Sequence, residues 1–390
     1  MLSITHFNQI KIFTASNLIL FLLTMPKIDI FNIDGYHQGI RIENIFSLLM
    51  FLIILFNLRY FKVEKEINFY FICTFIFFSY LIGYINGLNI EFFSIIRLIE
   101  YIVFVIFFSN FILNYEKIFS FFKILLVINL IVSILQSQDI VGIISSIGYI
   151  EPDFSMWRVA GVFSGSWELS FISSVSYFLI YQKEKKKLNI YLIIVLIILY
   201  LAGNRGIYIA FFSSILFLYF EKFNLNSLNL KNFKSLSIFL ILITLIIFAS
   251  YYFILEFLKL DIFLLLKSLI RLIFFNELMF TIGHDLEPQY YSWTYRLLDW
   301  QNHAAGFNKN LITNLFGVGY TAIYYDSFFI RILFGNGLIG FLILCLLSFK
   351  INFYMIIFLS LSSLSLDFVA SFKMFIILFL YFRCRNYLNN

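Results

Sequence analysis

Long runs of apolar residues, separated by short polar segments, cover most of this 390-residue chain. A membrane-spanning helix needs roughly 17–25 mostly apolar residues, and most runs are close to that length. The pattern therefore predicts an all-α polytopic membrane protein with about twelve transmembrane helices, residues 1–390 forming a single integral-membrane domain. The spans are expected at 10–25, 43–58, 67–86, 91–114, 117–136, 161–181, 188–203, 206–221, 235–256, 328–349, 351–366 and 368–382.

The positions of Lys and Arg orient these spans. With the N-terminus inside and strict alternation, the expected inside segments carry about twice as many Lys and Arg as the outside segments, as the positive-inside rule requires. The run Lys183-Glu-Lys-Lys-Lys187 marks the clearest inside segment. Both termini are then expected inside, and segment 137–160, the turn 203–206 and the large loop 257–327 are expected outside.

The loop 257–327 is the longest stretch without a clean hydrophobic span. Its first part mixes charged and apolar residues, which is typical of an amphipathic helix lying at the membrane interface. Residues 293–306 are expected to form a short helix, on which Arg296, Trp300 and His303 are spaced i, i+4 and i+7 and share one face. We interpret this loop as part of the outside working surface of a membrane enzyme.

Composition narrows the class further. The chain is 62% hydrophobic and only 13% charged, too little polarity to cover a soluble domain. The net charge of +6 does not indicate nucleic-acid binding, because the basic residues are scattered between apolar segments. The three cysteines form neither a disulfide framework nor a metal pattern. The first apolar run lacks a small-residue cleavage signature, so we expect a retained helix rather than a signal peptide.

Three arginines from separate segments, Arg158, Arg205 and Arg296, fall on the expected outside face. The guanidinium group is always charged, and its planar donors match phosphate oxygens. Such a cluster near the lipid boundary suits a lipid-linked pyrophosphate, although each arginine can instead contact a lipid headgroup or a loop. Arg205 is the strongest of the three, because it lies in a Gly-Asn-Arg-Gly turn between two apolar helices. Arg331 either joins this cluster or extends outward to the membrane surface.

Two carboxylates and one histidine are candidate proton acceptors. Glu168 lies near the start of the sixth span, and Asp326 lies at the outer lip of the tenth. A partly buried carboxylate can act as a general base or can bind a neighbouring arginine, and both alternatives are open for Glu168. His303 is the third candidate. Arg97 and Glu100, three residues apart in the fourth span, are interpreted as an internal ion pair that faces the bundle.

The sequence lacks the motifs of nucleotide-driven and metal-dependent enzymes. It contains no Walker sequence, no glycine-rich phosphate cradle and no Gly-x-Ser-x-Gly nucleophile turn. The histidines have no metal-ligand spacing with any partner, so we expect neither a metal nor a cofactor. A reaction outside the cell must then use a substrate that arrives already activated.

Three segments in order along the chain resemble the O-antigen polymerase and O-antigen ligase superfamily of bacterial envelope enzymes. They are Arg158-Val-Ala-Gly-Val-Phe-Ser-Gly-Ser-Trp-Glu168, Leu201-Ala-Gly-Asn-Arg-Gly206, and Arg296-Leu-Leu-Asp-Trp300 followed by Gly317-Val-Gly-Tyr320. Residues 328–340 resemble the span that follows the large periplasmic loop of that family. Ligases of the family usually carry a histidine just before that span, whereas this chain has Tyr325-Asp-Ser327 there, which favours a polymerase.

The resemblance implies transfer of a growing glycan from undecaprenyl diphosphate to the non-reducing end of a new lipid-linked repeat unit, on the periplasmic face of the bacterial inner membrane. Arginines would stabilise the diphosphate leaving group, and one of the three proton acceptors would take the acceptor's proton. Flat aromatic faces and one further arginine are the substrate-binding candidates, with a membrane-interface belt as the alternative for each aromatic residue. They are Trp157, Trp300, Tyr320 and Arg331.

Two other functions stay open. An O-antigen ligase would transfer the glycan to lipid A–core, and a flippase would move lipid-linked oligosaccharides across the membrane. Transporters of that kind usually contain internal repeats, whereas the halves of this chain show none and its one large loop comes late. The expected partners are undecaprenyl-diphosphate-linked repeat units, the lipid bilayer and a chain-length regulator protein, with no nucleic acid.

Overall fold

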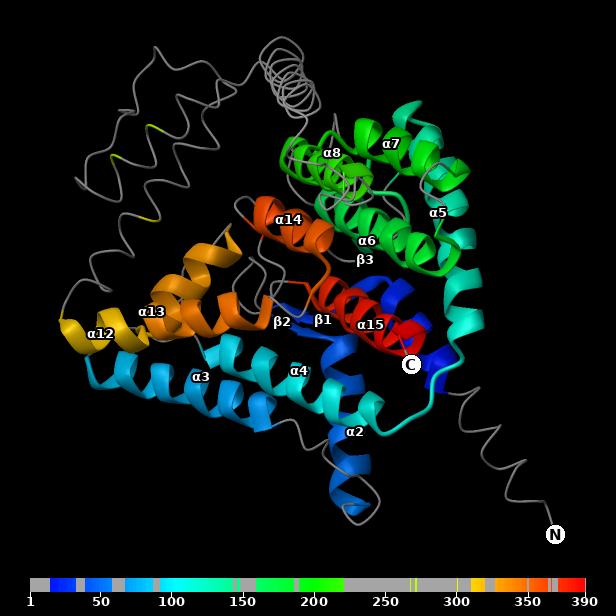
Figure 1. Ribbon diagram of the computed structural model, residues 1–390. Helices are drawn as coiled ribbons and strands as arrows, with labels where there is room; N and C mark the ends of the chain where they lie inside the picture. The colour runs from blue at the N-terminus through cyan, green and yellow to red at the C-terminus, as the bar shows by residue number, and fades with distance from the viewer. Residues whose placement is uncertain are drawn as a thin grey trace. The chain divides into compact units, whose positions relative to one another are not determined.

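In the computed structural model, the described part of the chain is predominantly helical (Figure 1). It divides into two compact units: unit 1 comprises Met1–Phe75, Glu91–Phe212 and Ile357–Asn390, and unit 2 comprises Ile76–Ile90 and Ser213–Ile356. The described residues are 15–32, 39–57, 67–86, 92–142, 146–147, 159–185, 189–220, 267, 271, 300, 310–319, 327–348, 351–363, 366 and 371–389.

Each expected span coincides with a helix, except 235–256, which lies outside the described residues. The helices are Ala15–Thr24, α2 Ile42–Phe56, α3 Ile67–Ile85, α4 Phe92–Ser109, α5 Tyr115–Ser137, α6 Ser166–Glu184, α7 Ile190–Ala202, α8 Arg205–Phe220, α12 Leu311–Phe316, α13 Phe328–Ser348, α14 Phe353–Ser362 and α15 Phe372–Asn389. The predicted helical class is thereby confirmed.

Two described helices, Tyr115–Ser137 and Phe328–Cys345, are long and apolar enough to cross a membrane, and several shorter helices are also apolar. Leu48, Phe56 and Ile131 are among many large apolar side chains that are exposed on the helices of unit 1. Apolar helices with exposed apolar faces are compatible with a helical membrane protein. The twelve-span topology itself stays a prediction.

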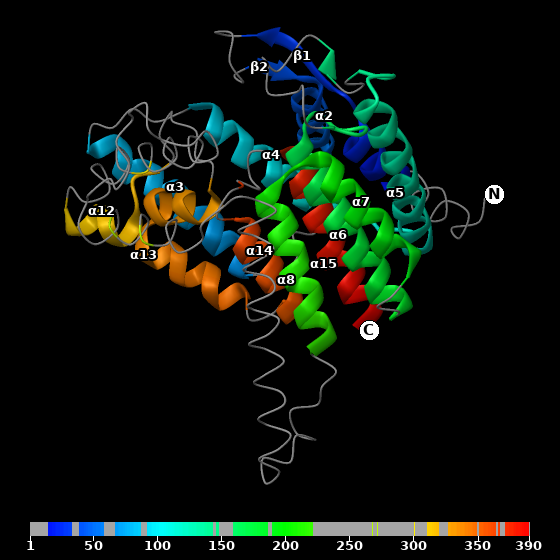
Figure 2. The same ribbon diagram turned by 90° about the horizontal axis from the view of Figure 1, so that it is seen from above.

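Helix α6 forms the buried centre of unit 1, in contact with α5, α7 and α15 (Figure 2). Most of its side chains are buried, including four serines. The hydroxyls of Ser170, Ser174 and Ser176 donate to backbone carbonyls one turn back, at 2.6 to 2.8 Å. Small residues whose polar atoms are satisfied within their own helix let neighbouring helices pack closely without a costly buried polar group.

A small sheet of order β2-β1-β3 accompanies the helices of unit 1 and was not predicted. Strand β1 (Lys27–Asn32) pairs antiparallel with β2 (Gly39–Arg41) and parallel with β3 (Ser146–Ile147). The alternation of polar and apolar residues in Lys27-Ile-Asp-Ile-Phe-Asn32 was the available signal. The sheet joins two segments that were both expected outside the membrane.

Polar contacts between the helices of unit 1 follow the expected alternation. Lys183 pairs with Glu116, and an Nη of Arg383 donates to Phe111 O at 3.2 Å. All four residues lie near ends of spans that were expected inside. At the opposite ends, Asn44 donates to Glu100, and Ser371 donates to Glu168 at 2.6 Å. Each of these contacts therefore joins segments that were expected on the same side.

In unit 2, helix α13 is broken at Gly337, where φ is 69° and ψ is −175°. Figure 1 draws α13 as two segments that meet at an angle beside α12. The break separates the carbonyls of Phe334 and Gly335 from the N–H groups that would bond them in an unbroken helix. The N–H groups of Val318 and Gly319 donate to these carbonyls instead, at 3.0 and 2.9 Å. Two glycine motifs that are distant in the sequence thus close one helix break.

The segment that closes the break also packs tightly on the part of α3 that belongs to unit 2. A Cβ atom at Gly83 would lie 1.8 Å from Val318 O, so no side chain fits there. Ser79 Oγ donates to Phe316 O at 2.6 Å and accepts from Asn336 Nδ2 at 3.3 Å. Backbone contact of this closeness fixes the return of the chain after the large loop.

We expect Gly317→Ala to destabilise unit 2. Gly317 has φ 79° and ψ −177°, and an added Cβ would lie 2.2 Å from Gly335 O. That backbone region is almost restricted to glycine, and its occupation by alanine costs about 1–3 kcal/mol before the steric clash is added. Thermal unfolding in detergent measures the effect. Gly142→Ala is the matched control, because nothing lies within 4 Å of its Cβ position. Equal melting temperatures for both variants would contradict the expectation.

Candidate functional site

The structure describes four of the predicted site residues, two in each unit. Glu168 and Arg205 belong to unit 1, and Trp300 and Arg331 belong to unit 2. The other predicted site residues lie outside the described part of the chain: Trp157, Arg158, Arg296, His303, Tyr320 and Asp326.

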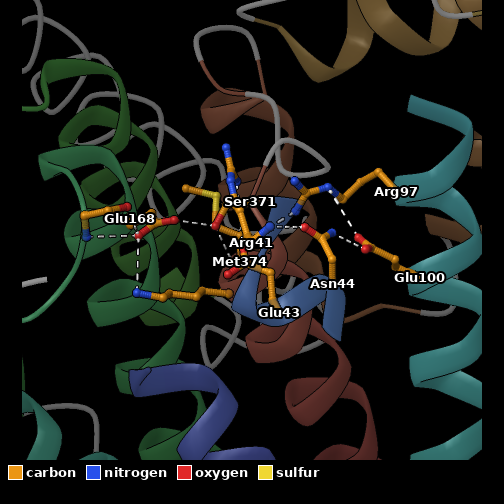
Figure 3. Close-up of polar contacts among 10 residues, drawn as sticks. Arg41, Glu43, Asn44, Arg97, Glu100, Glu168, Ser371 and Met374 are labelled. Atoms are coloured by element: carbon orange, nitrogen blue, oxygen red, sulfur yellow. Dashed lines mark hydrogen bonds and ion pairs between the residues drawn. The ribbon is translucent and has the colours of Figure 1, made fainter. Parts of the chain in front are cut away.

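Glu168 is a buried carboxylate in the first turn of α6, with a relative exposure of 5%. Ser164 donates to its Oε2 through Oγ at 2.6 Å and through the backbone N–H at 3.2 Å. Ser371 Oγ donates to Oε1 at 2.6 Å (Figure 3). The Lys373 ammonium lies 3.9 Å from Oε2. Of the two alternatives for Glu168, a nearby cation is therefore present, and the described one is a lysine from α15.

The turn before α6 is held by polar side chains of α5. Gln136 Oε1 accepts hydrogen bonds from the N–H groups of Ala160 and Gly161 at 2.9 and 2.8 Å, and Gln136 Nε2 donates to Gly161 O at 3.1 Å. Asn129 Oδ1 accepts from Val162 N at 3.1 Å. We refer to these hydrogen bonds from Gln136 and Asn129 as the clamp. The clamp holds the backbone of residues 160–162 and thereby positions the start of α6. The sequence analysis missed these two amides because nothing local distinguishes them on an apolar helix.

Helix α15 brings Ser371 and Lys373 to Glu168 and also packs on α4. Tyr101 of α4 stacks on Phe375, with the ring centroids 4.2 Å apart. The Lys373 ammonium lies 5.4 Å from the ring centroid of Phe163, within the range of a cation–π contact. The start of α15 therefore lies between a polar centre on α6 and an aromatic contact on α4.

A second group of charges lies where α2 begins beside α4 (Figure 3). Arg97 Nε is 3.6 Å from Glu100 Oε2, so the predicted internal ion pair is confirmed. The pair extends further than predicted: Arg97 Nη1 lies 3.8 Å from Glu43 Oε1, and Arg41 Nη1 lies 3.5 Å from the same oxygen. Asn44 donates to Glu100 Oε1. Two arginines and two glutamates thus neutralise one another, and we refer to these four residues as the α2–α4 charge cluster.

Arg205 is the first residue of α8 and is exposed. The preceding turn follows the predicted hinge: Gly203 ends α7 with φ 62°, and Asn204 Oδ1 accepts from Ile207 N at 3.2 Å. The structure gives Arg205 no hydrogen bond or ion pair with another described residue.

Arg331 and Trp300 are both buried in unit 2. Arg331 is 8% exposed, so the alternative in which it extends outward to the membrane surface is wrong. Trp300 is 2% exposed, which differs from the lipid-facing ring of a membrane-interface belt. Both side chains make contacts within the protein. Among the described residues, no three His, Cys, Asp or Glu side chains lie close enough together to hold a metal ion.

The fold and these charges define the class of the protein: a helical, membrane-compatible protein in which buried charges face opposite charges, and in which Arg205, at the start of α8, has no partner among the described residues. No protein-family model, curated protein or solved structure matches this chain. The resemblance to the O-antigen superfamily therefore stays a prediction that depends on the motifs alone.

We expect Gln136→Ala to loosen the turn before α6. The substitution removes the acceptor for two buried N–H groups, at a cost of about 1–3 kcal/mol. Hydrogen–deuterium exchange of peptides covering residues 159–163 should accelerate. Ser137→Ala is the control, because Ser137 is exposed and its Oγ bonds only to Ile134 O of its own helix. Unchanged exchange in the Gln136 variant would show that the clamp does not hold this turn.

We expect Arg97→Met to destabilise unit 1 strongly. It leaves Glu43 and Glu100 without their shared cation, and breaking a buried ion pair in this way costs about 3–5 kcal/mol. The control is Lys123→Met, which breaks a pair with Glu184 whose side chains are 32% and 23% exposed; such a pair contributes about 0–1 kcal/mol. Denaturant unfolding in detergent compares the two. Similar losses would indicate that the α2–α4 charge cluster is not effectively buried.

Proposed function

We propose that this protein is a surface-polysaccharide polymerase of the bacterial inner membrane. It transfers a growing glycan from undecaprenyl diphosphate to the non-reducing end of a lipid-linked repeat unit. The observation that carries the proposal is the state of Arg205. Arg41, Arg97 and Lys373 of the same unit each face a glutamate, whereas Arg205 is exposed and has no described partner. An arginine without a counter-charge suits an anionic substrate group.

The start of α8 adds further donors for an anion. Asn204 satisfies the N–H of Ile207, while the N–H groups of Arg205 and Gly206 have no acceptor among the described residues. The first N–H groups of a helix lack intrahelical partners and carry partial positive charge, so an anion is stabilised there. A diphosphate at this point would receive both the guanidinium fork and the backbone donors.

In the proposed transfer, all bonds form and break between the donor, the acceptor and side chains of the protein, and no cofactor takes part. The acceptor hydroxyl oxygen attacks the anomeric carbon of the donor sugar and forms the new C–O bond. The bond from that carbon to the diphosphate oxygen breaks, and its electron pair leaves with the diphosphate. The hydroxyl proton passes to Glu168, Asp326 or His303, and arginines stabilise the negative charge that develops on the leaving group.

The arrangement of contacts in unit 1 supports the topology that this reaction needs. The sheet and the Glu168 contacts join segments expected outside, and the Lys183–Glu116 contact joins segments expected inside. We therefore retain twelve spans with both termini in the cytoplasm. In this topology Glu168, Arg205 and the loop 257–327 face the periplasm. In unit 2, the chain returns from the loop 257–327 to the membrane after the segment with Val318 and Gly319, which closes the break in α13.

We expect Arg205→Ala to reduce glycan polymerisation about 10²- to 10³-fold, the usual effect of losing one donor that stabilises developing charge. Arg205→Lys keeps the charge but loses the planar fork, so its activity should be intermediate. Polysaccharide ladders on gels measure chain extension in cells, with protein amount followed by immunoblot. Lys185→Ala is the control, because it removes an exposed cation from the expected cytoplasmic side.

Arg158→Ala and Arg296→Ala are tested in the same assay. Normal ladders at normal expression for all three arginine variants would show that the proposed mechanism is wrong. Deletion of the gene separates polymerase from ligase: loss of a polymerase leaves core carrying one repeat unit, and loss of a ligase leaves bare core. Extension of lipid-linked repeat units by the purified protein in detergent, where there is no membrane to cross, would exclude a pure transporter.

A further inference from the structure

Lys373 carries a buried ammonium group that has no hydrogen bond to any residue that the structure describes. The residue is 7% exposed, and its Nζ bonds to no described residue. Its charged neighbour is Glu168, with Oε2 at 3.9 Å, and the Phe163 ring lies on another side at 5.4 Å. An ammonium has three donors, and leaving them unsatisfied away from water is costly. The geometry around Lys373 thus leaves room in its hydrogen bonding for an oxygen atom that no described residue supplies.

The distance between the Lys373 ammonium and the Glu168 carboxylate indicates which hydrogen bonds an oxygen atom between them must make. A separation of 3.9 Å between Lys373 Nζ and Glu168 Oε2 is too long for a direct hydrogen bond. One oxygen can lie about 2.8 Å from both atoms. That oxygen must accept from the ammonium and donate to the carboxylate. A hydroxyl group does both, as water does, whereas a deprotonated phosphate oxygen or a carbonyl only accepts.

The charge of the pair supports the same conclusion. Lys373 and Glu168 neutralise each other, so the site offers no excess positive charge to an anion. Arg205, which has no described counter-charge, offers that excess instead. Besides the α2–α4 charge cluster, unit 1 thereby contains two candidate ligand sites of different chemistry, one suited to an anion and one to a neutral hydroxyl.

We propose that Glu168 and Lys373 together bind one hydroxyl of the acceptor sugar, so that Lys373 is a substrate-binding residue. This inference rests on the proposed polymerase function. Glu168 is held in place for this role, because Ser164 donates to it and Ser371 donates to it from α15 (Figure 3). Both charged side chains lie in the first turn of a helix, α6 and α15, at ends expected to face the periplasm.

The two contacts leave the acceptor oxygen ready to react. One of its lone pairs accepts the hydrogen bond from Lys373, and the other is free to attack the anomeric carbon. As the new C–O bond forms and the bond to the diphosphate breaks, the hydroxyl proton moves to Glu168 Oε2. Lys373 keeps its proton throughout, and the electron pair of the broken bond leaves with the diphosphate.

The test is steady-state kinetics of the purified full-length protein in lipid nanodiscs, with donor and acceptor varied separately. Lys373→Met keeps the chain length but removes the charged donor. It should raise the acceptor KM about 10- to 100-fold, as expected for one hydrogen bond to a charged group, and leave the donor KM unchanged. Lys373→Arg restores a charged donor, so it should bring the acceptor KM part of the way back to the wild-type value. A merely structural defect would instead change the donor KM and kcat as well as the acceptor KM. An unchanged acceptor KM in Lys373→Met would overturn the inference.

Lys123→Met is the matched control, because it breaks another Lys–Glu pair of unit 1 at the ends expected inside. Both KM values should remain those of the wild type. If Lys373→Met does not fold, Glu168→Gln takes its place, since it keeps the volume and removes the proton acceptor. The acceptor KM should then rise together with a fall in kcat, and unchanged values would again overturn the inference.

A binding measurement separates this inference from the proposed function. The probe is the repeat-unit oligosaccharide freed from its lipid diphosphate, with binding followed by the shift in melting temperature. A wild type that binds it through Lys373 but extends no chain would overturn the polymerase and keep the hydroxyl site. A wild type that extends chains while Lys373→Met keeps its acceptor KM and its binding would overturn the hydroxyl site and keep the polymerase. Absence of both binding and extension would overturn both.

Discussion

Charge buried among apolar helices must be neutralised where it lies, and this requirement decides which helices of unit 1 meet. Arg97 of α4 lies between Glu100 of its own helix and Glu43 of α2. Glu168 of α6 faces Lys373 of α15. Removing one partner would leave a bare charge in an apolar surrounding, which costs far more than the intact pair contributes. Apolar packing alone is nearly indifferent to which lipid-compatible helices are neighbours, so these pairs specify the arrangement.

The same requirement applies to the backbone in unit 2. A helix that breaks inside an apolar surrounding exposes carbonyls that water cannot satisfy. The break of α13 at Gly337 is tolerated because Val318 and Gly319 donate to Phe334 and Gly335. The donors come from the segment that returns from the large loop, so the end of that loop and the shape of α13 depend on each other. Glycine is required at Gly317 in the returning segment and at Gly337 in α13, because the backbones of these two segments lie in direct contact.

Features that depend on neighbours in the sequence could be predicted, and features that depend on distant partners could not. Apolar runs located the helices, and the Gly203–Gly206 turn and the Arg97–Glu100 pair follow from spacing within a few residues. The contact between Ser371 and Glu168 joins residues 203 positions apart, and no local pattern indicates it. Residues 328–349 were expected to form one span that carries a Gly-Leu-Ile-Gly turn at Gly337–Gly340. That Val318 and Gly319 supply the donors for the break at Gly337 could not be predicted, because these residues meet it only in the folded chain. In the strand Lys27–Asn32 polar and apolar residues alternate only over Lys27–Ile30, and so short a pattern does not stand out among the longer apolar runs.

A transferase that joins two lipid-linked glycans must hold two ligands of opposite character, an anionic leaving group and a neutral hydroxyl, without exchanging their places. No described carboxylate faces Arg205, so its positive charge is not balanced by a described residue, and such a cation discriminates strongly in favour of a diphosphate. The Glu168–Lys373 pair is neutral, and its carboxylate repels an anion while its ammonium and carboxylate together match a hydroxyl. If Glu168 instead faced Arg205, Lys373 would be the cation without a facing carboxylate, and an anion would bind in the buried part of the bundle. The hydroxyl of the acceptor sugar would then have no carboxylate to take its proton. In the proposed reaction, the placement of one glutamate therefore separates the donor site from the acceptor site.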